Sequence, residues 1–516
     1  MTTRPNFLVV MGDQMTASAL GCYGNPAVRS PNLDALAASG VIFDAAYTNS
    51  PLCSPARASM MTGRLPSRTG CYDNGSYWPS TFPSVAHYLR AGGYRTVLTG
   101  KMHFIGPDQL HGFEERRTTD VYPADFDWTP DWRLDPHEPN HMWLDEGMAS
   151  IFGAGVAEVT NQLLYDDEVG HQAVRALHDI ARQDDGRPFF AVASFSHPHD
   201  PFVTRQRYWD LYEDVEIPLP AVRPGDVPDP DAHSTRLGRM CCWEDVAIPD
   251  EVVRRARRAY LANVSYVDEW VGRLVGTLRA LDLADDTVVI VTSDHGDMLG
   301  ERGHWYKCSF FEGSARVPLV IGAPGRLPAG RVSEPVSLVD FLPTVLELAG
   351  LGDTEPVDEL DGASLVPLCD GSAGAAPRTV AGEYLAEGTA APIVMIRRGP
   401  WKFVHSAVDR DQLYDLAADP LELTDLAAEP EHAALVAELR SEVARRWDLE
   451  ALRRAVLADQ ARRRLLMAAL RAGRVTPWDY TPPRDGSEEY IRTQGVGVPF
   501  YDIERLSRWP RQGPQA

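Results

Sequence analysis

Short apolar runs alternate with helical patterns along most of this chain, and this alternation constrains the fold more than any other feature. The runs lie at residues 6–11, 94–99, 188–196, 287–292 and 317–321. Each is short and apolar throughout, as a strand buried on both faces is. The helical patterns lie at residues 31–38 and 83–91, each with proline in the expected first turn, and at 256–281. The alternation predicts an α/β fold with a mostly parallel sheet flanked by helices.

The C-terminal third of the sequence has a different pattern. Small residues at 368–377 (LCDGSAGAAP) indicate a boundary, so we expect a catalytic α/β domain over residues 1–370. The segments VMIRRGPWKFVH and DQLYDL predict two antiparallel strands in a small subdomain over residues 378–428. Residues 429–472 have a helical rhythm, and the tail that follows is rich in proline and aromatic residues. We therefore expect residues 429–516 to form a helix and an extended tail that contacts a neighbouring subunit.

The charge balance and the cysteines limit the environment of the protein. Fifty basic residues stand against 73 acidic ones, a net charge of −23, which argues against nucleic acid and anionic membranes as partners. An anionic substrate would be repelled unless it carried a positive charge of its own or met a locally basic pocket. The seven cysteines lack CxxC spacing, which is typical of reduced thiols. The first apolar run is too short for a signal sequence or a membrane span, so we expect a cytoplasmic protein.

Polar side chains follow four of the predicted strands. Since ligands bind beyond the carboxyl ends of parallel strands, these groups are expected to meet at one edge of the sheet. A lone aspartate after a strand is more often a turn residue, and a lone histidine is more often structural. Two carboxylates and one imidazole together suit a hard divalent cation such as Ca²⁺, Mg²⁺ or Mn²⁺, and lysines and histidines would bind an anion. The candidate cation ligands are Asp13, Asp294 and His295. The candidate anion-binding residues are Lys101, His103, His199 and Lys307.

A cysteine motif identifies the chemistry expected at this edge. The stretch PLCSPARASMMTG places Cys53, Pro55 and Arg57 in a Cys-x-Pro-x-Arg pattern, and Thr-Gly follows after four residues. This pattern resembles the signature of the sulfatase family. The resemblance implies an alkaline-phosphatase-like fold and oxidation of Cys53 to formylglycine by a dedicated maturation enzyme. The hydrated aldehyde would then be the nucleophile, and Arg57 would hold it.

Further segments resemble the bacterial choline-sulfatase group of this family over nearly the whole chain. They are GKMHFIGPDQLHGFEERRTTDVYPADF, SFSHPHDPF, SDHGDMLGERG and RVTPWDY. The resemblance implies a sulfate monoester as substrate, choline sulfate above others, and a homo-oligomer, dimer or tetramer, in which the C-terminal extension packs against other subunits. The expected cation is Ca²⁺, with Mg²⁺ and Mn²⁺ as alternatives. An arylsulfatase or a phosphodiester or phosphonate-ester hydrolase of the same superfamily is the alternative function, and a non-catalytic binding protein is a third.

The resemblance also implies a role for each matching residue. His103 would act as base on the sulfated hydrate, and His199 or Lys307 would protonate the leaving alcohol. The implied metal ligands are Asp13, Asp294, His295 and the modified Cys53, and the implied sulfate-binding residues are Asn74, Lys101, His103, His199 and Lys307.

An acidic and aromatic segment is the candidate cation-binding wall. Residues 120–146 carry eight acidic residues, one arginine and several aromatic rings, which suit a quaternary ammonium group, although a surface loop held by its aromatic rings would look the same. The resemblance assigns the ammonium contact to Trp128 and to a carboxylate, Glu383 or else Glu387. The chain departs from the family pattern by having Gln14 for a second aspartate, Glu146 for a histidine and His304 for an apolar residue.

Overall fold

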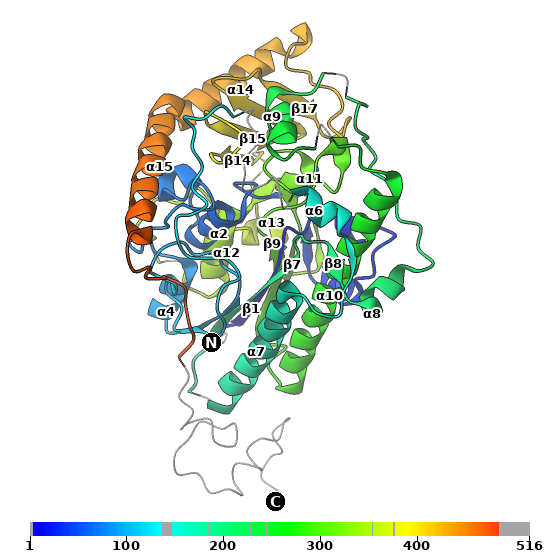
Figure 1. Cartoon of the computed structure of the whole chain (residues 1–516). Helices are drawn as coiled ribbons and strands as arrows, with labels where there is room; N and C mark the ends of the chain where they lie inside the picture. Colours follow the sequence, from blue (N-terminus) through cyan, green and yellow to red (C-terminus); the bar gives the residue numbers. More distant parts are fainter. Residues whose placement is uncertain are drawn as a thin grey trace, which may run out of the picture.

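An eight-stranded sheet lies at the centre of the larger part of the molecule (Figure 1). The computed structural model describes residues 4–136, 147–183, 185–227, 229–243, 246–352, 354–374 and 377–483. The strands, in spatial order, are β12 (Gly330–Val332), β2 (Val41–Phe43), β11 (Leu319–Gly322), β9 (Thr287–Ser293), β1 (Asn6–Asp13), β7 (Phe189–Pro198), β4 (Arg95–Gly100) and β5 (Glu115–Arg116). Strands β9, β1, β7 and β4 are parallel, whereas β11 is antiparallel to β9 and β2. The predicted mostly parallel sheet is confirmed.

Helices cover both faces of this sheet, which explains why its central strands are apolar throughout. Along β1, Leu8 and Val10 belong to one apolar core, and Phe7, Val9 and Met11 belong to the other. Helices α7 (Asn161–Gln183) and α10 (Asp250–Ala280) pack on the first face (Figure 1). On the second face lie α2 (Cys53–Thr62), α4 (Val85–Ala91) and α12 (Phe341–Leu348).

The prediction that two helices begin with proline in their first turn is right for one helix and wrong for the other. Helix α1 (Pro31–Ser39) begins with proline as predicted. Helix α4 begins two residues after Pro83, so the prediction of proline in its first turn was wrong. Ser84 is the N-cap instead, because its side chain and that of His87 satisfy each other's backbone amides in a capping box.

The small subdomain contains four antiparallel strands where the sequence predicted two. They are β14 (Thr379–Tyr384), β15 (Ile393–Arg398), β16 (Trp401–Ser406) and β17 (Gln412–Asp415). The segment VMIRRGPWKFVH holds two strands rather than one, because the chain reverses at Gly399, whose φ of 55° suits glycine. The strand that begins at Thr379 was not predicted.

The predicted helix over residues 429–472 is two helices. Helix α14 (Ala433–Arg446) packs on the small sheet, and α15 (Leu449–Arg471) runs down the side of the larger part (Figure 1). The chain breaks between them at Trp447, which has extended backbone angles, and Asp448 caps α15 through the amide of Ala451. The division into three domains stays a prediction.

The start of the C-terminal tail packs against its own chain. The Trp478 ring lies 5.1 Å from that of Phe126, Asp479 accepts a hydrogen bond from the Ala124 amide at 3.0 Å, and the Arg116 guanidinium lies over the Tyr480 ring. The subunit contact was expected for residues 429–516, of which residues 484–516 lie outside the described residues. That contact stays a prediction.

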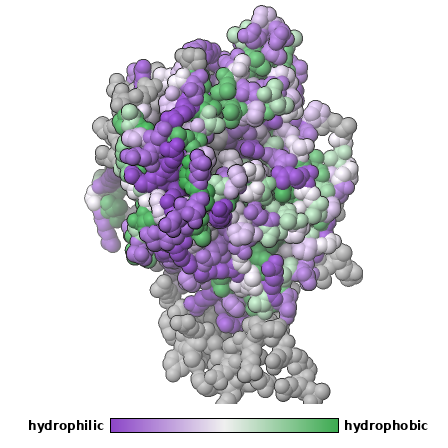
Figure 2. Space-filling view, turned by 90° about the vertical axis from the view of Figure 1, so that its right-hand side faces the viewer, coloured by the Kyte–Doolittle hydropathy of each residue, from purple (hydrophilic) through white to green (hydrophobic). Residues whose placement is uncertain are grey.

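One face of the surface is largely hydrophilic and the cysteines are reduced, as the charged composition and the cysteine spacing predicted. The face seen in Figure 2 is largely hydrophilic, with apolar side chains in scattered groups. All seven cysteines are free thiols. Among the helices described, none combines the length and the apolar character needed to cross a lipid bilayer.

Candidate active site

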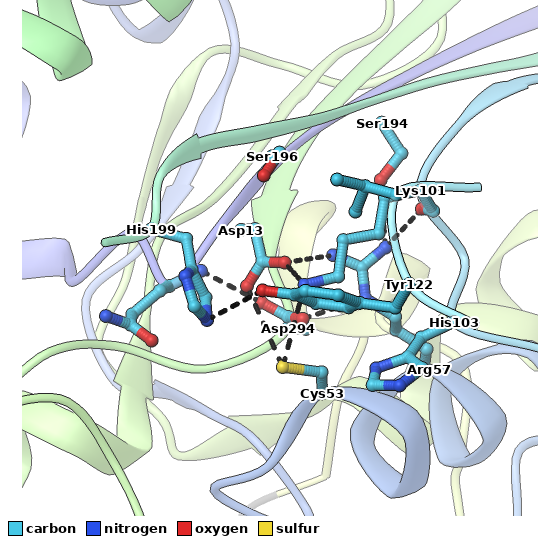
Figure 3. Close-up of polar contacts among 12 residues, drawn as sticks. Asp13, Cys53, Arg57, Lys101, His103, Tyr122, Ser194, Ser196, His199 and Asp294 are labelled. Carbon is cyan, nitrogen blue, oxygen red and sulfur yellow. Dashed lines mark hydrogen bonds and ion pairs between the residues drawn. The ribbon is translucent and has the colours of Figure 1, made fainter. Parts of the chain in front are cut away.

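The polar residues that follow the parallel strands meet at the carboxyl edge of the sheet (Figure 3). Asp13 is the last residue of β1, Lys101 follows β4, His199 follows β7 and Asp294 follows β9. Because β1 pairs in parallel with β7 and β9, and β4 with β7, the four strands end on the same side. The structure thus brings these groups together as the sequence predicted.

Cys53 lies at the centre of this edge as the first residue of α2. It is 1% exposed, and its Sγ lies 3.2 Å from Nε2 of His295, 3.5 Å from Nζ of Lys307 and 3.7 Å from Nζ of Lys101. Burial raises the pKa of the Cys53 thiol to about 11, so the encoded thiol is protonated near neutral pH. Its Sγ marks the place where the oxygens of a formylglycine hydrate would lie.

Arg57 lies one helical turn after Cys53 and fixes the carboxylates around it. Its Nε donates to Oδ2 of Asp294 at 2.8 Å, and its NH1 donates to Oγ of Ser194 at 2.9 Å. Its NH2 lies 3.5 Å from Oδ2 of Asp13. The i+4 spacing of the motif therefore places a guanidinium under the two acidic strand ends.

Four buried side chains form a candidate metal site. Ligand atoms of Asp13, Cys53, Asp294 and His295 all lie within 4.8 Å of one another. Burial lowers the pKa of His295 to about 3, so the imidazole is neutral and can act as a ligand. Two carboxylates, which offer hard oxygen donors, together with one neutral imidazole fit a divalent cation such as Ca²⁺, Mg²⁺ or Mn²⁺.

Basic side chains line the opposite side of Cys53. Lys307 contacts Nε2 of His199 at 2.6 Å and donates to Oε1 of Gln14 at 2.8 Å. Nζ of Lys101 pairs with Asp13 and lies over the Tyr122 ring at 4.2 Å. Burial lowers the pKa of Lys101 to about 7. Gln14 stands where the family pattern has a second aspartate, and its side-chain carbonyl faces Lys307.

Two histidines complete this basic side. Burial, reinforced by the nearby lysines, holds the pKa values of His103 and His199 well below their usual range. Both ring nitrogens of His103 are buried, and neither has a hydrogen-bond partner among the described residues. An unpartnered buried imidazole in a basic pocket suits an anionic ligand that would supply the missing contact.

Asn74 and Asp120 support these groups from loops. Oδ1 of Asn74 accepts a hydrogen bond from the Ser54 amide at 3.0 Å and so fixes the start of α2. Asp120 accepts the amides of Met102 and His103, each at 3.0 Å, which fixes the turn that carries His103. In the sequence, Asp120 was one of the eight acidic residues of the candidate cation-binding segment 120–146, and nothing local distinguished it as a support for the turn that carries His103.

The structure brings Trp128 to the site but not Glu383. The Trp128 ring lies 5.3 Å from that of His103 and 4.8 Å from that of Tyr122. Glu383 is buried elsewhere, where its oxygens accept hydrogen bonds from the amide and hydroxyl of Ser67 at 2.6 and 2.5 Å and from Nε1 of Trp447 at 2.6 Å. Glu383 therefore joins the start of a short helix to the small subdomain.

Glu387, the alternative carboxylate, has different surroundings. It is buried, and its Oε2 has no hydrogen-bond partner among the described residues. Burial and the charge of Asp73 raise the pKa of Glu387 to about 7, while Lys307 opposes this shift. Of the departures from the family pattern, Glu146 lies outside the described residues, and His304 packs against the Trp243 ring at 5.4 Å.

Comparisons with known proteins agree with this geometry. Residues 5–351 match the sulfatase family model, residues 300–448 match the C-terminal region of N-sulphoglucosamine sulphohydrolase, and residues 454–509 match the choline sulfatase enzyme C-terminal model. The chain belongs to the sulfatase family.

Individual relatives extend the comparison. The chain is 48% identical to choline-sulfatase of Rhizobium meliloti (strain 1021), covering 99% of this chain and 100% of the relative. It is 32% identical to mouse (Mus musculus) iduronate 2-sulfatase over 67% of this chain and 69% of the relative. The crystal structure of phosphonate monoester hydrolase of Agrobacterium radiobacter matches with a TM-score of 0.68 and 28% identity, covering 87% of this chain and 96% of that one.

Proposed function

We propose that the protein hydrolyses choline sulfate to choline and sulfate and does so in the cytoplasm. The observation that carries this proposal is the position of Trp128, whose ring borders His103 at 5.3 Å, next to the basic groups around Cys53. A zwitterionic ester would place its sulfate on the basic side and its ammonium group against an aromatic face. Such a substrate is not repelled by a protein of net charge −23. The 48% identity to a choline-sulfatase supports the same substrate.

We assign the ammonium-binding carboxylate to Glu387 rather than Glu383. Both oxygens of Glu383 are engaged by Ser67 and Trp447, whereas Oε2 of Glu387 is buried without a partner in the part of the chain that the structure describes. A buried carboxylate without a partner is costly, and an organic cation would offset that cost. The charge of Lys307 lowers the pKa of Glu387 against the effect of burial, which supports a position for Glu387 near the basic groups around Cys53.

The proposed chemistry needs two groups that the encoded side chains do not provide: a formylglycine made from Cys53 and a bound divalent cation. Formylglycine at position 53, made by a maturation enzyme, would provide the nucleophilic oxygen that takes the sulfuryl group. A divalent cation held by Asp13, Asp294, His295 and residue 53, with Ca²⁺ as the proposed ion, would supply charge to the sulfuryl oxygens.

The chain's own side chains perform the remaining tasks. Lys101, Lys307 and Asn74 would hold the sulfate oxygens and oppose the negative charge that builds up in the transition state. Lys307 donates toward Nε2 of His199, and Nδ1 of His199 faces the Asp200 carbonyl at 2.7 Å. This arrangement can pass a proton to the leaving alcohol. His103, neutral and without a partner, would take a proton when sulfate is released.

The alternative function is that of an arylsulfatase or a phosphonate-ester hydrolase. The structural match to a phosphonate monoester hydrolase supports testing this alternative. The deciding experiment compares kcat/KM for choline sulfate, an aryl sulfate with an uncharged ring, and an aryl phosphonate monoester on fully matured protein. A preference for the aryl sulfate or the phosphonate over choline sulfate would refute our proposal.

Trp128→Ala is expected to lower kcat/KM for choline sulfate about threefold to thirtyfold, because a cation–π contact contributes roughly 0.5 to 2 kcal/mol. An aryl sulfate with an uncharged ring should retain its kcat/KM. Steady-state kinetics with both substrates test this. Equal losses for both would mean that Trp128 supports the loop rather than the cation.

Glu387→Gln is expected to lower kcat/KM for choline sulfate by about tenfold or more, since the amide keeps the shape but loses the charge that faces the cation. Because burial raises the pKa of Glu387 to about 7, KM for choline sulfate should also rise as the pH falls below 7, and this rise should vanish in the variant.

Glu383→Gln is the matched control, since it removes another buried carboxylate of the same subdomain. It should lower the melting temperature and leave the ratio of kcat/KM values for the two substrates unchanged. A change of that ratio in Glu383→Gln, with none in Glu387→Gln, would return the ammonium contact to Glu383.

A further inference from the structure

The inner face of α15 holds the loop that carries Trp128. Three polar side chains of this helix reach the segment 129–132: Arg463 reaches Thr129, Arg464 reaches the Pro130 carbonyl, and Gln460 reaches the Trp132 amide. Arg463 and Gln460 are buried. We call this set of contacts the α15 clamp. It joins residues more than 300 positions apart in the sequence, as the separation of 334 between Arg463 and Thr129 illustrates.

Arg463 is the centre of the α15 clamp. Its NH1 and NH2 form a two-point ion pair with Asp73, at 2.8 and 2.7 Å, and NH1 also donates to Oγ1 of Thr129 at 2.8 Å. Its Nε donates to Asp459 at 2.7 Å on the same helix. Asp73 is fully buried, so this pair is inside the protein and its geometry is fixed.

Two of the partners of Arg463, Asp73 and Thr129, lie directly beside residues proposed to contact the substrate. Asp73 precedes Asn74, and its Oδ1 accepts the Gly75 amide at 2.9 Å. A Cβ at Gly75 would lie 2.7 Å from the Thr129 amide nitrogen and 2.8 Å from the Trp128 carbonyl carbon. The turn that carries Asn74 and the backbone of Trp128 are therefore in contact, and one guanidinium holds both.

The α15 clamp also reaches the other side of the proposed cation pocket. Gln460 accepts the Trp132 amide at 3.0 Å, and Nε1 of Trp132 donates to the Ala386 carbonyl at 2.7 Å. Ala386 precedes Glu387. Of the two groups that would face the ammonium, Trp128 precedes Thr129, whose hydroxyl Arg463 binds, and Glu387 follows Ala386, whose carbonyl is bound by the Trp132 side chain.

We propose that Arg463 is a positioning residue for substrate specificity: through Thr129 it sets the distance between the Trp128 ring and the sulfate-binding groups. This inference rests on the proposed choline-sulfate activity. Arg463 acts through Thr129 and Asp73 rather than on the reacting atoms, so its loss should weaken binding of the cation and spare the chemical step. Since cation–π attraction weakens beyond about 6 Å, a small shift of the loop is enough to reduce it.

Thr129→Val tests this with little risk to folding, because it removes one hydroxyl and leaves the Arg463–Asp73 pair intact. We expect KM for choline sulfate to rise about threefold or more, with kcat and the kinetics of an aryl sulfate with an uncharged ring nearly unchanged. Thr129→Ser, which keeps the hydroxyl, should restore the wild-type KM. In a Trp128→Ala background, Thr129→Val should have no further effect on KM.

Arg463→Gln combined with Asp73→Asn tests the ion pair without leaving the fully buried Asp73 as an unpaired charge, although partly buried Asp459 also loses its contact with Arg463. It should raise KM for choline sulfate at least as much as Thr129→Val does. Arg454→Ala is the control on the same helix, because the ion pair that Arg454 forms among the described residues is with Glu450 on the surface. The inference is overturned if these variants lower the melting temperature but leave KM unchanged, or if both substrates lose equally.

The same data separate this inference from the proposed function. If Trp128→Ala affects both substrates equally, the choline-sulfate proposal fails. If Trp128→Ala is selective for choline sulfate and Thr129→Val is not, only the positioning role of Arg463 fails.

Discussion

Cys53→Ala is expected to abolish nearly all sulfatase activity, with kcat/KM falling by about 10³-fold or more, while the protein folds normally. Alanine keeps the helical start of α2 and leaves only a small gap, but it can neither be oxidised to formylglycine nor carry a nucleophilic oxygen. Turnover of choline sulfate by the purified variant measures the loss, and circular dichroism and the melting temperature measure folding.

Mass spectrometry of the wild-type protein supplies the independent check on this nucleophile. The tryptic peptide that contains Cys53 should be lighter by the difference between CH₂SH and CHO in active protein. The fraction of converted peptide should scale with specific activity across preparations. Full activity with an unconverted cysteine, or in Cys53→Ala, would refute the mechanism. Cys71→Ala is a suitable control, because it removes another buried thiol near the start of α2, 3.4 Å from Oγ of Ser54.

His199→Ala is expected to lower kcat/KM for choline sulfate by about 10²- to 10⁴-fold, the range for loss of a general acid. The choline oxygen is a poor leaving group that needs a proton, and Lys307 contacts Nε2 of His199 at 2.6 Å on the path by which the proton would arrive. A nitrophenyl sulfate, whose leaving phenolate is stable without a proton, should lose much less. Steady-state kinetics with both esters test this.

Lys307→Ala completes the assignment of the leaving-group acid. Burial opposes the charged form of Lys307, whereas nearby carboxylates, Asp200 first among them, raise its pKa above the usual value. Lys307 is also a proposed sulfate-binding residue, so its loss should affect both esters. Equal losses for the two esters in His199→Ala would show that His199 binds sulfate and does not take part in protonating the alcohol.

The sequence predicted which polar residues meet around Cys53, because the rules that bring them together are local. Asp13, Lys101, His199 and Asp294 each follow an apolar run, and parallel strands bring their carboxyl ends together. The cysteine motif is likewise contained within one helix. Such features require only the strand order and the helical repeat, and both can be inferred from short windows of sequence.

The cation side could not be predicted in the same way because it depends on distant contacts. Glu383 and Glu387 are four residues apart, and only the tertiary structure reveals that Ser67 and Trp447 engage the first while the second has a free oxygen. The pairing of Arg463 with Asp73 spans 390 positions and leaves no local signal. The break at Trp447 was missed for a related reason, since the apolar rhythm continues across it.

The burial of Cys53 has a consequence for the life of the protein before it folds. Only 1% of this residue is accessible, and Lys307, which lies against its sulfur, is encoded 254 positions later. An enzyme that oxidises Cys53 must reach it before that later segment is in place. At a synthesis rate of about 5 to 20 residues per second, the ribosome leaves roughly 13 to 50 seconds between the two. The proposed oxidation of Cys53 must therefore occur during synthesis or before folding is complete. A molecule that folds with an unmodified Cys53 can no longer be oxidised unless it unfolds.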